Sequence, residues 1–204
     1  MIRDFHSSRF SLFVVSLVLL LLSDRVVAQT PGRFASQGVW EFGGNVAYQR
    51  TTMLVEVQAD QTSSIFSFLP YVGYFPFNNG IEFGLNPLGV QRYWDSENRT
   101  TVYTILGTVG LTGNAGGIFF PFAEVQLGYS AEILGGAIAD LNPGQKQRDG
   151  FAWGVRGGVK CAVIDHCLVN AGLQYQEFTL ETKSTPIRTG SNVLMASIGL
   201  TFWF

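Results

Sequence analysis

The chain has 204 residues, of which 47% are hydrophobic, 14% are charged and 24 are glycine. Its formal net charge of −2 argues against the basic surface that a nucleic-acid-binding protein needs. This length and composition fit one domain rich in strands rather than two soluble domains.

Residues 1–28 predict a cleaved signal peptide. Arg3 and Arg9 precede an apolar run over residues 11–22, and Ala28 follows as a small residue of the kind that signal peptidase accepts. A run of about a dozen apolar residues is well short of the roughly 20 that a membrane-spanning helix needs. We therefore expect cleavage after Ala28 rather than a membrane anchor.

Cleavage would leave residues 29–36 as a short lead and residues 37–204 as the mature domain. It would remove three of the 13 basic and two of the 15 acidic residues, so the ten basic and thirteen acidic residues that remain give a charge of −3. Export would also make a disulfide between Cys161 and Cys167 chemically permissible.

The mature chain alternates apolar residues with small or polar ones, which is the period of a β-strand with two different faces. No stretch in it approaches 18 uninterrupted apolar residues, so a bundle of membrane-spanning helices is excluded. The alternation and the turn residues between its segments predict eight strands. In chain order these are residues 38–50, 64–75, 81–93, 101–111, 118–131, 151–162, 168–179 and 192–204.

The connections between these segments alternate in length. The short ones are residues 76–80, 112–117 and 163–167. The others are mostly longer and more polar, namely residues 51–63, 94–100, 132–150 and 180–191. Membrane β-barrels show this asymmetry, with tight periplasmic turns and longer outside loops, so we expect the second set to lie outside the cell.

Side-chain parity divides each predicted strand into an apolar face and a polar, glycine-rich face. In the first strand Trp40 and Phe42 lie on the apolar face, whereas Glu41 and Gly43 lie on the other. An eight-stranded barrel has an interior only just wide enough for side chains, so glycines on the inward face relieve crowding. The pattern predicts a lipid-facing outside and a polar inside. The alternative is a water-soluble sandwich with the aromatic residues in its core.

Aromatic residues cluster near both ends of the predicted strands, as expected where amphipathic rings anchor at the two membrane interfaces. Trp203 departs from the pattern because its parity is inward. We expect its indole to lie against the periplasmic mouth with its N–H in water.

The final strand ends in Gly199-Leu200-Thr201-Phe202-Trp203-Phe204, with alternating apolar residues and a C-terminal phenylalanine. Together with residues 70–85 and 120–129, it resembles the outer-membrane protein β-barrel domain family that includes OmpA-type and OmpX-type barrels. The resemblance covers about residues 37–204. It implies an all-β, eight-stranded, antiparallel, up-and-down transmembrane barrel in the cell outer membrane. It also implies that Phe202 and Phe204 form the signal that the barrel assembly machinery reads.

No catalytic group can be nominated, and we expect no cofactor. His166 is the only histidine of the mature chain, and it lies in a predicted periplasmic turn, where an outer-leaflet enzyme could not use it. His166 with Cys161 and Cys167 offers fewer ligands than a closed zinc site usually has, so a disulfide or two separate thiols is the preferred interpretation.

The predicted register of the last short turn favours the disulfide. Pairing Val159 with Val169, and Val155 with Leu173, places Cys161 opposite Cys167. Directly opposed residues of an antiparallel pair can have a Cα separation that a disulfide tolerates.

Five charged residues have inward parity in the periplasmic half of the strands: Glu41, Glu82, Glu124, Arg156 and Lys160. Isolated charges in a narrow lumen would be costly, so we expect opposite charges to pair and to plug it. Separate hydration of these side chains in an open vestibule is the alternative.

These features predict a non-enzymatic, monomeric barrel with a structural, adhesion or surface-interaction role. Its partners would be outer-membrane lipid, the assembly machinery and a surface or protein met by the outer loops. The alternative is a narrow channel for small solutes or apolar molecules, as in OmpW-like barrels. The family is functionally mixed, so the resemblance does not choose between them.

Overall fold

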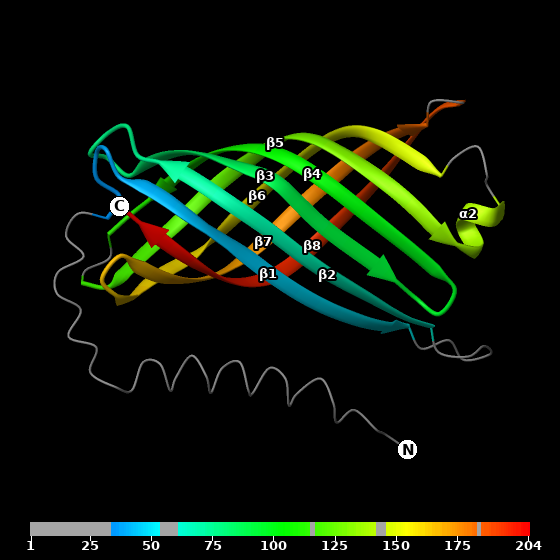
Figure 1. The fold of residues 1–204 in the computed structure, drawn as a ribbon, viewed down its shortest axis with the longest axis horizontal. Coiled ribbons are helices and arrows are strands. Elements are labelled where there is room, and N and C mark those ends of the chain that lie inside the picture. The colour runs from blue at the N-terminus through cyan, green and yellow to red at the C-terminus, as the bar shows by residue number, and fades with distance from the viewer. Residues whose placement is uncertain (1–33, 54–60, 115–116, 142–145, 183–184) are drawn as a thin grey trace, which may run out of the picture.

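The computed structural model describes residues 34–53, 61–114, 117–141, 146–182 and 185–204. They form a closed antiparallel barrel in which each strand pairs with its neighbours in the chain and the last strand pairs with the first (Figure 1). The strands are β1 (Trp40–Met53), β2 (Gln61–Tyr74), β3 (Ile81–Trp94), β4 (Asn98–Thr112), β5 (Phe119–Gly136), β6 (Gln147–Ile164), β7 (Cys167–Thr182) and β8 (Thr185–Trp203). The short helix α2 (Ala137–Leu141) follows β5.

All eight predicted strands are present, and the up-and-down order is confirmed. The predicted signal peptide, residues 1–28, lies outside the described residues. Strand ends at the short turns agree with the prediction within about two residues, but several strands continue farther at the other end of the barrel. Much of the predicted loops 132–150 and 180–191 is therefore strand. The reason is that polar residues beyond the apolar band lose the alternating pattern, while their backbone groups still pair across the barrel.

The outer face of the barrel is apolar, as the parity predicts. Ile105 and Leu127 are about half exposed, at 52% and 53%, and similar side chains from all eight strands complete the band. The inward residues between them, such as Leu106 and Gln126, are fully buried. A continuous apolar belt of this kind would be unfavourable in water and is what a membrane-spanning barrel requires. Within the described ranges no helix has the length and apolar character needed to cross a membrane.

The predicted disulfide between Cys161 and Cys167 is wrong, because both thiols are free. Cys161 pairs with Val169, and Cys167 pairs with Ile164. The turn between β6 and β7 contains only Asp165 and His166, so the strands extend farther toward it than the sequence suggested.

Two backbone features make this tight turn possible. His166 has a positive φ of 63°, the left-handed conformation that tight hairpin turns use. The register also shifts between Ala162 and Ile164, so one extra residue of β6 is accommodated there. The predicted pairing of Val159 with Val169 is therefore displaced by two residues, and Val159 pairs with Ala171.

The register predicts that the folded protein keeps two free thiols even after passage through an oxidising compartment. Protein recovered from the outer membrane, alkylated in denaturant and measured by mass spectrometry, should carry a label on both Cys161 and Cys167. A Cys161→Ser variant should fold as the unchanged protein does. Recovery of a chain linked between the two cysteines would contradict the register.

Candidate functional site

Aromatic side chains close the end of the lumen that has the short turns and is predicted to face the periplasm. Phe34 lies at their centre, with its ring centroid 5.5 Å from that of Phe75, 4.9 Å from that of Phe120 and 5.9 Å from that of Trp203. Val39, Ala162 and Leu168 complete this cluster, and every one of these side chains is buried. We call the cluster the aromatic plug. Its key residue, Phe34, comes from the lead before β1, to which the sequence analysis gave no role.

Trp203 points inward as its parity predicts, but the expectation that its N–H reaches water is wrong. The side chain is 9% exposed, and its indole nitrogen has no hydrogen-bond partner among the described residues. Phe34 covers its inner side, and the His166 ring lies 4.5 Å from it at the turn. Phe34, from the lead, therefore helps to exclude water from the Trp203 indole at this end of the lumen.

Phe202 and Phe204, the predicted assembly signal, lie on the outer wall near the same end. They are 47% and 68% exposed. The backbone of Phe204 exchanges two hydrogen bonds of 3.0 Å with Trp40 and so completes the seam between β8 and β1. Their role in assembly stays a prediction.

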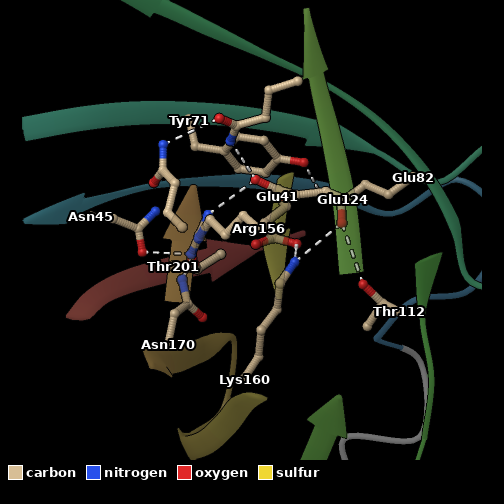
Figure 2. A network of polar contacts seen from close by, with 12 residues as sticks. Glu41, Asn45, Tyr71, Glu82, Thr112, Glu124, Arg156, Lys160, Asn170 and Thr201 are labelled. Carbon is tan, nitrogen blue, oxygen red and sulfur yellow. Dashed lines mark hydrogen bonds and ion pairs between the residues drawn. The ribbon is translucent and has the colours of Figure 1, made fainter. Parts of the chain in front are cut away.

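Next to the plug, a lysine binds two buried carboxylates (Figure 2). The Lys160 Nζ atom lies 2.6 Å from Oε2 of Glu41 and 3.1 Å from Oε2 of Glu82. The Tyr71 hydroxyl donates a 2.7 Å hydrogen bond to Oε1 of Glu82. Thr112 adds a longer hydrogen bond of 3.4 Å to Oε2 of the same carboxylate. Five strands, β1 to β4 and β6, thus contribute to one electrostatic cluster.

The aromatic rings and the lysine are also in contact. The Lys160 Nζ atom lies 5.4 Å from the ring centroids of both Phe34 and Phe122, within the distance at which a cation interacts with a π-system. The aromatic plug therefore covers the charge while it excludes water from it.

The second ion pair joins β5 to β6. Arg156 lies directly opposite Glu124 in the register, with 3.4 Å between its Nη1 and the Glu124 Oε1. Its Nη2 donates a 2.7 Å hydrogen bond to Oδ1 of Asn45 on β1, across the lumen (Figure 2). Phe122 lies 4.9 Å from its guanidinium carbon. The structure thus brings all five predicted lumen charges into two neighbouring clusters that share the Phe122 ring.

Glycines create the space that these side chains occupy. Gly73 and Gly84 lie opposite each other on β2 and β3. A Cβ on Gly84 would lie 2.5 Å from the Tyr71 hydroxyl oxygen, and a Cβ on Gly73 would collide with the Glu82 carboxylate. Larger residues at these two positions would displace the Tyr71 to Glu82 hydrogen bond.

Glutamines extend the network toward the outer end. Gln126 donates a 2.7 Å hydrogen bond to Glu124 and accepts bonds of 3.2 Å from both Gln174 and Gln176. Gln91 donates to Gln176 from the opposite wall. Gln126 and Gln174 have the inward parity of Glu124 and Asn170 on the same strands, but this layer was not predicted, because parity alone does not show which polar residues meet.

The outer half of the lumen is apolar, which the sequence analysis missed. Its members share inward parity and burial: Ala47, Val102, Leu106, Ala152, Phe178, Leu180, Val193 and Met195. We call them the apolar layer. Their inward parity could have predicted this layer, but we had considered only polar residues for the lumen. Nearer the outer end, Arg148 pairs with Glu132.

The chemistry available in the lumen is that of a packed interior. The plug, the ion pairs, the glutamines and the apolar layer follow one another along the barrel and bury one another's polar atoms. Among the described residues no group of three or more His, Cys, Asp or Glu is placed to hold a metal. His166 instead hydrogen-bonds through Nδ1 to the Trp203 carbonyl oxygen at 2.8 Å.

Replacing Lys160 should show how strongly the barrel depends on its central cation. Lys160→Met leaves the buried carboxylates of Glu41 and Glu82 unpaired, so the free energy of unfolding should fall by about 3 to 5 kcal/mol. Urea unfolding in lipid vesicles, followed by tryptophan fluorescence, measures the change. Lys146→Met is the matched control, because Lys146 is exposed.

A triple variant separates the electrostatic loss from the packing loss, because the single and the triple variant both carry Lys160→Met. Adding Glu41→Gln and Glu82→Gln to Lys160→Met removes the unpaired charges and should restore much of the lost stability. Equal losses in the single and triple variants would contradict an electrostatic role for the cluster.

The chain is similar in fold to solved structures of bacterial barrels. Neisserial surface protein A matches with a TM-score of 0.52 at 17% identity, over 82% of this chain and 98% of that one. Ail of Yersinia pestis covers 82% of this chain and 99% of its own at 11% identity, and OprG from Pseudomonas aeruginosa covers 83% and 97% at 13%, both with TM-scores of 0.44. No protein-family model matches the chain, and no curated protein matches it in sequence. The likeness to the Neisserial protein supports the eight-stranded barrel fold, and the apolar belt is what a barrel that spans a membrane requires.

Proposed function

We propose that this protein is a non-enzymatic barrel with a closed lumen, which acts through its outer surface as a structural or surface-contact protein of the envelope. The observation that carries this proposal is the filling of the lumen. The inward side chains are buried from the aromatic plug at one end to the apolar layer at the other, and the three central ion pairs occupy the charges of all five lumen residues.

Strand length supports a role outside the membrane. β5 and β6 each have 18 residues and β8 has 19, whereas a spanning strand needs about 9 to 11. The surplus lies at the end opposite the C-terminus, where α2 lies as well (Figure 1). A rigid wall of paired strands therefore projects from the membrane and presents its loops to other surfaces. The barrel would enter the membrane as a monomer through the assembly machinery.

A channel for small apolar molecules is the second candidate, and the apolar layer is what favours it. Phe178, Leu106 and Met195 could line a path for an apolar solute from the outer end. Burial of these three side chains to 2% or less argues for mutual packing instead, and the glutamine layer and the ion pairs lie beyond them. We therefore favour the closed barrel.

Planar bilayers distinguish the two candidates. The purified mature protein should give no stable conductance, because paired charges and the aromatic plug occupy the lumen. Liposomes containing it should not swell in small neutral solutes or take up a small apolar dye faster than liposomes containing a heat-denatured sample. A steady conductance or rapid uptake by the unchanged protein would contradict the closed lumen.

Surface contact has its own test at α2. Leu141, the last residue of α2, is 81% exposed, so its apolar side chain is available to another surface. Bacteria that display the protein should attach to a hydrophobic polymer surface better than bacteria that display Leu141→Asp. Asp140→Asn, which changes the neighbouring residue, is the control. Equal attachment of all three strains would argue against contact through α2.

A further inference from the structure

The outer wall of β1 to β4 carries a group of arginines around one tryptophan. Arg50, Ser64, Trp94 and Arg99 face one another in successive register pairs across the four strands. Arg92 lies one outward position nearer the membrane on β3. All three arginines are exposed, so their charges are available to a ligand.

Arg92, Trp94 and Arg99 line a hollow in this wall of about 310 Å³. This volume lies at the lower end of the range for small-molecule sites, roughly 300 to 1,000 Å³. A hollow lined by two guanidinium groups and one aromatic ring suits a phosphate group, because each guanidinium can bind two phosphate oxygens at once.

The height of the hollow on the barrel indicates which phosphate reaches it. The register row of Arg92 also contains Tyr48 on β1 and Phe66 on β2. Counted from the outer end of the barrel, these two are the first residues of the apolar band on their strands. Both face outward and are 51% and 42% exposed. The row of Trp94 and Arg99 follows immediately beyond, at the level where lipid headgroups meet the aromatic girdle.

The charges of these arginines are not used within the barrel. Among the described residues, none of the three forms an ion pair. Asp95 and Glu97 are the nearest acids along the chain, and neither forms an ion pair with these arginines. The Asp95 carboxylate instead accepts hydrogen bonds from the backbone N–H groups of Glu97 at 2.8 Å and Asn98 at 2.6 Å. These bonds hold the pKa of Asp95 below its ordinary value.

The opposite side of the rim carries several acidic residues. Asp149 and Glu181 face each other on the outward side of β6 and β7, and Glu177 lies on the same face of β7. Among the described residues, the arginine side is therefore the part of the rim that favours anionic headgroups.

We propose that Arg92 and Arg99, with Trp94 between them and Arg50 beside them, bind the phosphate groups of a phosphorylated lipid in the outer leaflet. The site faces lipid, lies at headgroup height and presents planar cations without internal partners. It does not depend on whether the lumen is closed, so the lipid experiment and the conductance experiment fail independently.

The test uses the mature protein in phosphatidylcholine nanodiscs with or without lipid A, a phosphorylated glycolipid. Native mass spectrometry should detect retained lipid A, and added lipid A should raise the thermal unfolding midpoint. Arg92→Gln and Arg99→Gln should each weaken binding by about tenfold, because each removes charged hydrogen bonds to phosphate. Arg99→Lys should bind with intermediate affinity, since an ammonium cannot make the bidentate contact.

Controls separate the phosphate, the lipid and the general charge. Lys146→Gln removes one exposed positive charge elsewhere on the outer end and should leave binding unchanged. Dephosphorylated lipid A should bind at least about tenfold more weakly. Three results would overturn the proposal. They are binding of the dephosphorylated lipid as tight as that of lipid A, binding of lipid A by both glutamine variants as tight as by the unchanged protein, and equally tight binding of inorganic phosphate alone. Unchanged migration of unboiled samples on gels confirms that each variant is folded.

Discussion

The closed hydrogen-bond ladder is the constraint on which the rest of this structure depends. Lipid offers no partner to a backbone N–H or carbonyl group, so the eight strands must satisfy one another and the sheet must have no edge. The seam shows this requirement directly, because Trp40 and Phe204 exchange two backbone hydrogen bonds where β8 meets β1. Closure with eight strands then sets a narrow lumen.

A narrow lumen decides what the inward residues can be. There is little room for water around a charge, so each buried ion needs a protein partner. Lys160 meets this need for two carboxylates at once, and Tyr71 supplies a further hydrogen bond to Glu82. The glycines at 73 and 84 are part of the same solution, because a side chain there would occupy the space of Tyr71. Small and charged residues are thus two parts of one packing arrangement.

Most of the fold could be predicted because a strand in a barrel wall has two chemically different environments. Nearly every segment of the sequence therefore alternates with a period of two. From this parity alone, Glu41, Glu82 and Lys160 were correctly predicted to point inward. Counting from the strand ends placed these inward charges in the same half of the barrel, which is why the ion pairs could be anticipated.

What could not be predicted depends on events that leave no period in the sequence. The bulge near Ala162 and the left-handed conformation of His166 shift the register between β6 and β7. No pattern in residues 161–167 predicts either feature. The aromatic plug depends on Phe34, which precedes the first strand and so has no parity at all. The apolar layer differs from these two features, because its inward parity could have been read from the sequence although its residue types match those of the lipid face.

The treatment of charge inside and outside the barrel follows from the same physics and leads to different uses. Inside the barrel, Arg156 forms an ion pair with Glu124 and a hydrogen bond with Asn45, and these contacts link β1, β5 and β6. Outside, Arg92 and Arg99 project from equally rigid strands but have no ion-pair partner among the described residues. A guanidinium at the membrane surface keeps part of its hydration, so it does not need an internal carboxylate to be tolerated. The arginines that stabilise the fold are therefore the paired ones, and those that remain on the wall are free to engage the leaflet in which the barrel lies.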